Sequence, residues 1–251
     1  MGERLSAVPD PARGAALVTG GAPRIGKALA LTCAQAGYDV AIHCRRIDDD
    51  AETTAADIRA LGRRALLVTA DLRNEAETAP LVGAVEAELG AATLLVNCAS
   101  VFEDDSFAGM NRHSWDLHME TNLRGPLVLA QAFARRVVGD HRGLIVNILD
   151  QRVLRTRPEF FSYSLSKAAL WEATRMMALA LAPRIRVNGI GPGPVLQSIH
   201  QTPDDFAAEA AATPLARPVD PAEIGQALAY LIDASAVTGQ MIAVDSGQHL
   251  A

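Results

Sequence analysis

The sequence predicts an α/β protein in which one doubly wound parallel sheet of seven strands carries helices on both faces. Short apolar runs alternate with longer stretches of helical periodicity along the 251 residues, which is the pattern of repeated strand–helix–strand units. The apolar runs are hydrophobic throughout instead of alternating, as expected for strands that helices cover on both faces. Right-handed crossovers then bring the loops after the strands to one edge of the sheet, where ligands bind.

Each strand is expected where a short apolar run is bounded by turn residues. These runs lie, in chain order, at Ala15–Val18, Asp39–Ile42, Ala65–Thr69, Thr93–Asn97, Leu144–Ile148, Arg186–Ile190 and Met241–Val244. Helices are expected in the periodic stretches between them, the first of which is closed by Gly37. Their predicted ranges are Ile25–Ala36, Asp49–Leu61, Glu75–Leu89, Trp115–Val138, Ser162–Leu181 and Ala222–Ile232.

Residues outside these elements divide into a lead-in and a loop. Residues 1–14 are polar and lack an apolar stretch, so we expect a flexible lead-in rather than a secretory signal. Residues 15–251 then form a single domain. Residues 191–221 are rich in proline and form the least regular stretch. An interdomain linker there would leave too little chain for a second domain, so we interpret this stretch as a substrate loop over the ligand edge.

Composition and charge exclude several classes of partner. Hydrophobic residues make up 49% of the chain, and the formal net charge of −6 comes without a basic run, which disfavours nucleic acid. No segment approaches the roughly 20 apolar residues of a membrane span. The three cysteines lack C-x-x-C spacing, so we expect reduced thiols and a cytoplasmic protein. We assign no metal because most histidines are scattered without metal-ligand spacing, at His113, His118, His141, His200 and His249.

A glycine-rich turn follows the first predicted strand and runs directly into the first helix. It reads Thr19-Gly20-Gly21-Ala22-Pro23-Arg24-Ile25-Gly26. Glycines at this place allow a tight turn and a close approach of the backbone to a pyrophosphate at the helix N-terminus. Many turns need glycine for backbone reasons alone. The placement between first strand and first helix therefore carries the prediction of a Rossmann-type dinucleotide site, with Gly20, Arg24 and Ile25 at the cofactor.

The end of the second strand indicates which dinucleotide binds. An NAD site normally places an acidic side chain here to accept from the ribose 2′-hydroxyl. This sequence has no acidic residue before Asp48 and instead offers His43, Arg45 and Arg46. Guanidinium groups suit a 2′-phosphate, so we predict NADP(H) as the cofactor. The alternative is a solvated basic strand end without a ligand.

Tyr163 and Lys167 are the candidate catalytic pair. Four residues apart on a helix, they share one face. A tyrosine with its ordinary pKa near 10 exchanges protons poorly at pH 7, and a nearby ammonium lowers that pKa towards a useful range. The spacing alone also arises by chance on helix surfaces. Its position after the fifth strand, downstream of a cofactor turn, places the pair at the expected ligand edge.

These motifs together resemble the short-chain dehydrogenase/reductase family from Thr19 to the C-terminus. The resemblance implies that Tyr163 is the general acid, that Lys167 lowers its pKa and holds the nicotinamide ribose, and that Asn122 anchors a proton-relaying water. It also implies a homotetramer. The remaining family positions border the cofactor: Asp71 and Leu72 near adenine, then Asn97, Cys98, Ala99 and Ser100, and finally Pro192, Gly193 and Val195.

Two departures from the family pattern narrow the resemblance to its pteridine reductase branch. Most members carry a serine 13 residues before the tyrosine, where this sequence has Asp150. Arg24 replaces the usual middle glycine of the turn. The branch also shows Asn-Ala-Ser followed by an aromatic residue, which here is Phe102, with Cys98 substituted for alanine. The resemblance therefore implies a small-molecule substrate of pterin type.

The chemistry of a pterin accounts for these exchanges. Reducing its C=N bond delivers hydride to carbon and a proton to ring nitrogen. A carboxylate at Asp150 can accept from ring N–H groups and pass a proton through Tyr163. Phe102 could stack on one face of the ring with nicotinamide on the other, while Arg24 and Ser100 border it. The alternatives are core packing for Phe102, turn capping for Asp150 and phosphate contact alone for Arg24.

Two further functions remain open at this point. A carbonyl reductase of the same fold, acting on a ketone or a 3-oxoacyl group, would use Asp150 in place of the serine. A non-catalytic, dinucleotide-sensing module would keep the cofactor site without the chemistry, which the intact Tyr163, Lys167 and Asn122 disfavour. The acidic run Glu103-Asp104-Asp105 is interpreted as a solvated loop.

Overall fold

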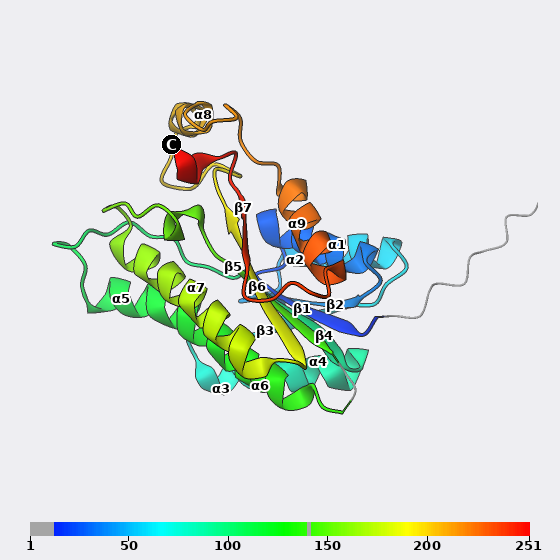
Figure 1. Ribbon diagram of the computed structural model, residues 1–251. Helices are drawn as coiled ribbons and strands as arrows, with labels where there is room; N and C mark the ends of the chain where they lie inside the picture. Colours follow the sequence, from blue (N-terminus) through cyan, green and yellow to red (C-terminus); the bar gives the residue numbers. More distant parts are fainter. Residues whose placement is uncertain (1–12, 140–141) are drawn as a thin grey trace, which may run out of the picture.

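The computed structural model describes residues 13–139 and 142–251. Its strands form one seven-stranded sheet in the order β3-β2-β1-β4-β5-β6-β7, and every neighbouring pair is parallel (Figure 1). The predicted fold class is confirmed. Most of the predicted lead-in, residues 1–14, and His141 lie outside the described residues. The chain reverses its direction of progress across the sheet between β1 and β4, which is the switch point where ligands bind in such folds.

The strands cover the predicted runs, and five of them extend further. Gly143–Ile148 and Ile185–Pro192 each start one residue earlier than expected, and the latter continues through Pro192 at the ligand edge. The bounds are Ala15–Thr19 for β1, Asp39–Cys44 for β2, Ala65–Thr69 for β3, Ala92–Asn97 for β4, Gly143–Ile148 for β5, Ile185–Pro192 for β6 and Met241–Val244 for β7.

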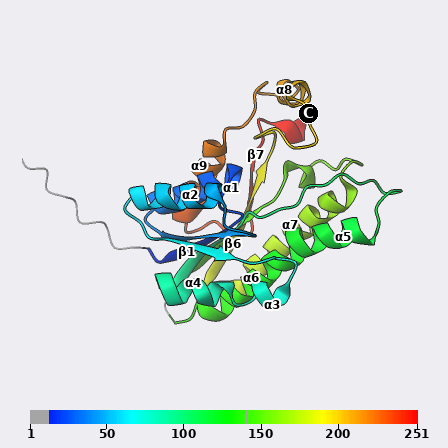
Figure 2. The same cartoon turned by 180° about the vertical axis from the view of Figure 1, so that it is seen from behind.

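Helices cover both faces of the sheet (Figures 1 and 2). Alternate strand residues face the two layers: Val40 and Ile42 pack towards α1, α2 and α9, whereas Ala41 packs towards α4, α6 and α7. The bounds on the first face are Arg24–Gln35 for α1, Asp49–Ala60 for α2 and Pro221–Asp233 for α9. On the second face they are Leu81–Leu89 for α4, Gly125–Arg136 for α6 and Phe161–Leu181 for α7, with α5 (Arg112–Met119) packed against α7.

The helix predicted at Glu75–Leu89 is divided in two. A short helix α3 covers Glu75–Thr78, and α4 begins after Pro80. A proline lacks the backbone N–H that would continue the helical ladder, and it restricts the residue before it. The prediction of one continuous helix was wrong because it gave the apolar periodicity precedence over this proline.

The helix predicted at Trp115–Val138 is also interrupted. It starts earlier, as α5, and passes through one π-helical turn at Glu120–Arg124 before continuing as α6 to Arg136. Asn111 caps its start by accepting from two backbone N–H groups of the first turn. A π-turn inserts one residue into a helix and occurs often at functional sites. The periodicity of the apolar residues gives no sign of it.

The substrate loop, residues 191–221, contains a helix that the sequence interpretation missed. Helix α8 spans Pro203–Ala211 and begins with a capping box. The Thr202 hydroxyl oxygen accepts from the Asp205 backbone N–H, and the Asp205 carboxylate accepts from the Thr202 backbone N–H. The order Thr-Pro-Asp-Asp is a recognised helix start, with proline at the first position. Figures 1 and 2 show α8 beside the C-terminal segment, away from the two main layers.

Within residues 13–139 and 142–251, no helix combines the length and the apolar character needed to cross a membrane.

Candidate active site

A cavity of about 760 Å³ opens at the carboxyl ends of the strands. The glycine turn after β1 and the ends of β2 and β3 line one part of it. Residues after β4, β5 and β6, together with the start of α7, line the other part. The predicted cofactor turn and the predicted catalytic pair therefore share one cavity.

The glycine turn holds the backbone where a side chain would not fit. Gly20 has a φ of +61°, and a Cβ there would lie 2.9 Å from the Cα of Ala99. A Cβ on Gly26 would lie 1.9 Å from the carbonyl oxygen of Gly20. Helix α1 starts without a side-chain cap and without an acidic residue in its first turn. Its first N–H groups are therefore available to an anion, and the turn fits the diphosphate of a dinucleotide.

Arg24 adopts a left-handed backbone conformation that ordinarily favours glycine. Its φ is +55°, which costs a non-glycine residue about 1–2 kcal/mol. The guanidinium donates to the carbonyl oxygens of Leu196 and Gln197, at 3.1 and 3.0 Å. Arg24 therefore ties the glycine turn to the start of the substrate loop, across the mouth of the cavity. The sequence interpretation did not foresee this contact.

The three predicted cofactor residues at the end of β2 lie in different surroundings. His43 is buried, its Nδ1 accepting from the Gly20 N–H at 3.4 Å and its Nε2 lying 3.1 Å from the Ala70 carbonyl oxygen. Burial lowers the pKa of His43, so it is a neutral spacer rather than a charge for the 2′-phosphate. Arg45 is exposed and lines the cavity, whereas Arg46 is exposed outside the lining.

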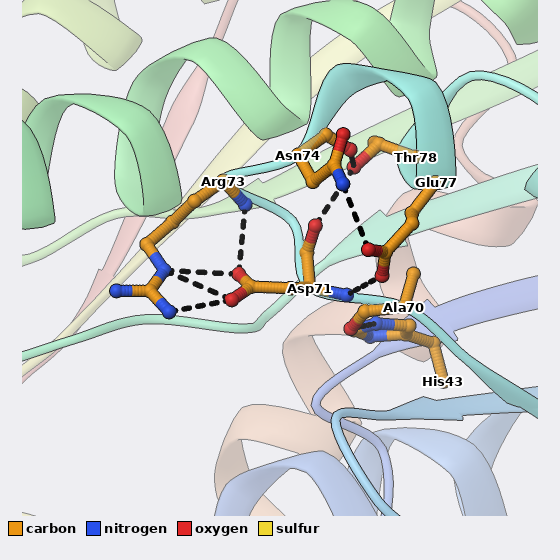
Figure 3. Close-up of polar contacts among 7 residues, drawn as sticks. All are labelled: His43, Ala70, Asp71, Arg73, Asn74, Glu77 and Thr78. Atoms are coloured by element: carbon orange, nitrogen blue, oxygen red, sulfur yellow. Dashed lines mark hydrogen bonds and ion pairs between the residues drawn. The ribbon is translucent and has the colours of Figure 1, made fainter.

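The end of β3 carries a compact polar cluster (Figure 3). The Asp71 carboxylate accepts from the Arg73 guanidinium and backbone N–H, and these bonds hold the pKa of Asp71 at about 2. The Asp71 backbone N–H in turn donates to Glu77 at 2.8 Å. Asp71 and Leu72 both line the cavity. The carboxylate is therefore ionised and fixed at the cofactor end.

Tyr163 and Asp150 meet at the catalytic end of the cavity. The Tyr163 hydroxyl donates to Asp150 Oδ2 at 2.8 Å, and both side chains line the cavity wall. Asp150 Oδ1 accepts from the Arg152 backbone N–H at 2.8 Å. Asp150 therefore caps the following 3-10 turn (Gln151–Val153) and also engages the tyrosine, so the two interpretations of this residue hold together.

Lys167 lies one helical turn after Tyr163 and is 2% exposed. Its ammonium donates to the Ile148 carbonyl oxygen at 2.8 Å and lies 5.7 Å from the centre of the Tyr163 ring. Burial lowers the pKa of Lys167 to about 8, against the attraction of Asp150. A lysine with this pKa gives up its proton more readily than one in water.

Burial, and after it the neighbouring Asp150, favours the neutral phenol of Tyr163. Burial raises the pKa of Asp150, and burial together with the Asp150 charge raises the pKa of Tyr163 well above its ordinary value. The phenol of Tyr163 is therefore protonated at neutral pH and can donate this proton. This differs from the expectation that the ammonium of Lys167 would dominate and lower the pKa of the tyrosine.

Asn122 lies in the π-turn and holds the segment after β4. Its Oδ1 accepts from the Val101 N–H at 2.8 Å, and its Nδ2 donates to the Val101 carbonyl oxygen at 2.9 Å. Oδ1 also accepts from the Ser100 hydroxyl at 3.2 Å, and Nδ2 donates to Ser166 at 3.1 Å. Asn122 is fully buried and does not line the cavity. In this geometry its side chain positions residues 100–101.

An aromatic stack lies beside the tyrosine. The Phe102 ring stacks on Phe160 with centroids 4.1 Å apart, and it forms a T-shaped pair with the Tyr163 ring, whose centroid lies 4.7 Å away. The Arg152 guanidinium lies 5.2 Å from the centre of the Phe160 ring. Phe102 and Phe160 both line the cavity. Because Phe160 covers one face of Phe102, a flat ligand has the opposite face for stacking unless Phe160 moves.

The cavity brings most of the predicted site residues together. Arg46, Asn97 and Asn122 are the predicted residues that do not line it. Asn97 is buried behind the wall, where its amide donates to Asn147 at 2.8 Å, so it joins β4 to β5 instead of facing the cofactor. Ile25, Ala99, Ser100, Pro192, Gly193 and Val195 all line the cavity as expected.

Several lining residues escaped the sequence interpretation. Phe160 stands three residues before Tyr163, in a Phe-Phe pair that could have been used as a signal. A further group comes from the substrate loop and the C-terminal segment, where spacing carries no signal: His200, Gln201, Phe206, Glu209 and Gln248. Among the described residues, no group of three His, Cys, Asp or Glu side chains is arranged to hold a metal.

The fold, the glycine turn and the Tyr163–Lys167 pair define a class of protein. The chain belongs to the short-chain dehydrogenase/reductase family, and residues 20–249 match the family model described as enoyl-(acyl carrier protein) reductase. Among curated proteins, 3-oxoacyl-[acyl-carrier-protein] reductase FabG of Aggregatibacter actinomycetemcomitans is 34% identical over 92% of this chain and 97% of its own length.

Solved structures give a more specific likeness. FolM alternative dihydrofolate reductase 1 from Brucella canis, complexed with NADP, superposes with a TM-score of 0.92 and 46% identity over 96% of this chain and 95% of that chain. The FolM protein from Brucella suis, also in complex with NADP, gives a TM-score of 0.91 and 46% identity over 95% of this chain and 96% of that chain.

Proposed function

We propose that the protein is an NADPH-dependent reductase of a pterin-like ring, in which hydride goes to carbon and a proton to nitrogen of a C=N bond. The observation that carries the proposal is the hydrogen bond of 2.8 Å between the Tyr163 hydroxyl and the partly buried Asp150 carboxylate. A serine in this place would offer a hydroxyl to a ketone oxygen. A carboxylate offers an acceptor to ring N–H and amino groups instead.

The cofactor is NADP(H), which supplies the hydride. The two FolM proteins were each solved with NADP, and the turn between β1 and α1 has the backbone shape that a diphosphate needs. Arg45 is the cavity-lining residue suited to the 2′-phosphate, because its guanidinium is exposed and the neighbouring His43 is neutral. Asp71 and Leu72 border the adenine end.

The residues at the other end handle the proton. Tyr163 is protonated at neutral pH, since its pKa is raised above an ordinary value that already exceeds 7, and it donates this proton to the ring nitrogen. Asp150 has a raised pKa and can return a proton to the tyrosine from the ligand or solvent. Lys167 stays near the ring of Tyr163 and stabilises negative charge that develops on the phenol oxygen.

Phe102 gives the substrate ring its orientation. One face of Phe102 is covered by Phe160, so a flat heterocycle stacks on the opposite face. Arg24 and Ser100 line the same cavity, where Arg24 offers its remaining N–H groups to ring substituents and the Ser100 oxygen offers an acceptor. The carboxylate of Asp150 and the stacking face of Phe102 thus select a planar ring with N–H groups.

The test is a comparison of substrates by NADPH oxidation, followed spectrophotometrically. We expect turnover of dihydropterins, such as dihydrobiopterin, dihydromonapterin or dihydrofolate, to exceed that of simple ketones and 3-oxoacyl thioesters. Turnover of ketones or thioesters alone would overturn the proposal. The comparison variant is Asp150→Ser, which places at this position the residue that most family members carry and is assayed with the same substrates.

A second candidate is reduction of a 3-oxoacyl group. The FabG protein that is 34% identical to this chain carries that name, and this observation favours the candidate. Asp150 argues against it, because a partly buried carboxylate next to the tyrosine repels the oxyanion that forms from a ketone. A non-catalytic sensing role is disfavoured by the assembled Tyr163, Lys167 and Asp150.

The homotetramer and the cytoplasmic location expected of a family member stay predictions. Size-exclusion chromatography with light scattering tests the first, and fractionation of the producing cell tests the second. A monomer at micromolar concentration would contradict the tetramer.

A further inference from the structure

A buried histidine lies just behind the catalytic wall and takes no part in the proposed reaction. His118, on α5, has 0% of its surface exposed. Its Nδ1 lies 2.7 Å from the Ser162 hydroxyl, and its Nε2 accepts from the Glu103 backbone N–H at 3.2 Å. The two neighbours flank the cavity: Ser162 precedes Tyr163, and Glu103 follows Phe102.

The hydrogen-bond partners fix the tautomer of His118. A backbone N–H can only donate, so Nε2 must be the acceptor and the ring proton must sit on Nδ1. Nδ1 therefore donates to the Ser162 oxygen, and the Ser162 hydroxyl in turn donates a hydrogen bond to the Asp105 carboxylate. Burial lowers the pKa of His118, which keeps the ring neutral at pH 7. The chain of bonds thus runs in one direction, from His118 to Asp105.

Asp105 closes this chain onto the start of the catalytic helix. Its Oδ1 accepts from the Ser162 backbone N–H at 2.9 Å, and its carbonyl oxygen accepts from the Phe161 N–H at 3.1 Å. Phe160, the residue before α7, has a φ of +53° and provides no side-chain cap. Asp105 therefore caps α7, which corrects the interpretation of Asp105 as part of a solvated loop, whereas Glu103 and Asp104 are exposed as expected.

The backbone around Phe102 is held from several sides. Asn122 bonds both the N–H and the carbonyl oxygen of Val101. The Phe102 carbonyl oxygen lies 3.0 Å from His200 Nε2, in the substrate loop. The Glu103 N–H is held by His118. The peptide bond between Phe102 and Glu103 is thus clamped between two histidines that come from opposite sides of the cavity.

We propose that His118 is a positioning residue that fixes the Phe102 ring against Tyr163. It does so through the Glu103 N–H, while the bonds from Nδ1 to Ser162 and from Ser162 to Asp105 orient the ring so that Nε2 faces this N–H. The inference deepens the proposed function and rests on it for the identity of the substrate. Loss of the bond to Glu103 frees the backbone next to Phe102, so the ring no longer presents a fixed stacking face.

Two substitutions separate the halves of this arrangement. In His118→Gln, the longer side chain brings its amide oxygen to the place of Nε2, where it accepts from Glu103. In His118→Asn, the shorter side chain brings its amide nitrogen to the place of Nδ1, where it donates to Ser162 but leaves the Glu103 N–H without an acceptor. The glutamine variant therefore keeps the bond next to Phe102, and the asparagine variant loses it.

The first readout is steady-state kinetics with the dihydropterin that the wild-type enzyme turns over best. We expect His118→Asn to raise the KM for that substrate about tenfold and to leave the KM for NADPH within twofold. His118→Gln should stay within about threefold of wild type in both. Equal losses in both variants, or no change in either, would overturn the proposal.

The second readout needs no substrate. Hydrogen–deuterium exchange of the peptide covering residues 101–105 should be at least tenfold faster in His118→Asn than in wild type, and close to wild type in His118→Gln. Peptides from β1 and α1 should exchange at wild-type rates in both variants. Faster exchange everywhere would mean that His118 merely supports the fold, and this would overturn the positioning role.

This readout also separates the two proposals. If the wild-type enzyme reduces ketones and no pterin, the proposed function fails, and the exchange comparison still decides whether His118 fixes the Phe102 backbone. If pterins are reduced and the two variants do not differ in exchange or KM, the proposed function stands and the role of His118 fails.

Discussion

The two ends of the cavity are built in different ways. At the cofactor end, the backbone makes the site: Gly20 and Gly26 leave no room for a Cβ, and α1 presents uncapped N–H groups. At the substrate end, side chains make it: the Asp150–Tyr163 bond and the Phe102–Phe160 stack. A backbone site tolerates few substitutions and serves one ligand class. A side-chain site can be changed residue by residue, and substrate preference can therefore diverge on a constant cofactor site.

The strongest way to separate the two ends is to remove the phenol. Tyr163→Phe deletes the proton donor and leaves the aromatic packing against Phe102, so kcat should fall by roughly 10³-fold. The cofactor end is untouched, and the Kd for NADPH, measured by fluorescence titration, should stay within about twofold of wild type. A variant that retained a tenth of wild-type turnover would show that another group supplies the proton.

The next largest effect concerns the residue that distinguishes the substrate end. Asp150→Asn keeps the shape but removes the charge, and kcat for a dihydropterin should fall about 10²-fold. Asp150→Ser should lower pterin turnover similarly and raise ketone turnover relative to wild type. The ratio of the two rates, measured in parallel NADPH assays, is the test. An unchanged ratio in Asp150→Ser would contradict the role of the carboxylate in substrate choice.

The cofactor end is probed by its one predicted side-chain contribution. Arg45→Ala should raise the Kd for NADPH by about 10-fold to 100-fold, as expected for loss of a charge-assisted bond of about 1.5–3 kcal/mol. The Kd for NADH should hardly change. Arg46→Ala is the matched control, because Arg46 is exposed outside the cavity lining, and its effect should be smaller. Equal effects of both substitutions would contradict this placement.

Between the two ends lies a buried ammonium that reduces stability. The pKa of Lys167 is about 8 in the folded protein, below its ordinary value of 10.5. Between these values the unfolded chain binds more protons, so the free energy of unfolding rises with pH through this window. At pH 7 the lysine is protonated in both states, and the folded state carries the full cost.

Lys167→Met should therefore stabilise the protein at pH 7 by about 2 kcal/mol, after subtraction of the lost hydrogen bond to Ile148. The Tm should rise by several degrees. Activity should be lost at the same time. Lys27→Met is the control, since Lys27 is partly exposed and pairs with Asp57 at 2.7 Å. Differential scanning calorimetry measures both variants, and a lower Tm for Lys167→Met would contradict the stated sign.

The smallest effect is expected at the joint between the ends. Arg24→Gly relieves the backbone strain at a φ of +55°, whereas Arg24→Ala retains it, and both lose the bonds to Leu196 and Gln197. The glycine variant should be more stable than the alanine variant by about 1 kcal/mol. Chemical denaturation measures this difference. Equal midpoints for the two variants would show that the strain is absorbed elsewhere.

The sequence predicted the cofactor end better than the substrate end for a physical reason. A glycine that no other residue can replace leaves a mark in the sequence, and the position of Gly20 and Gly26 after an apolar run was enough to place the turn. Asp150 was found because it stands 13 residues before Tyr163. His200 and Glu209 reach the cavity through tertiary folding, and nothing in their local spacing indicates it.

Errors at the level of helices have a similar origin. Apolar periodicity reports which face is buried, so it located the helices on both faces of the sheet correctly. It does not report the π-turn at Glu120–Arg124 or the break at Pro80, since both preserve the buried face on either side. The buried tautomer of His118 is likewise fixed by partners that lie far away in the sequence.

The π-turn also constrains how this protein can change. Each residue of a helix turns the chain by about 100°, so deleting one residue from the turn would rotate all of α6 by that angle. Val128, Leu129 and Phe133, now buried, would swing away from the sheet. Asn122 is therefore locked in register with the interior beneath it. Substitutions in the wall of the cavity can change which ligand fits, whereas the length of this helix cannot change without displacing buried residues.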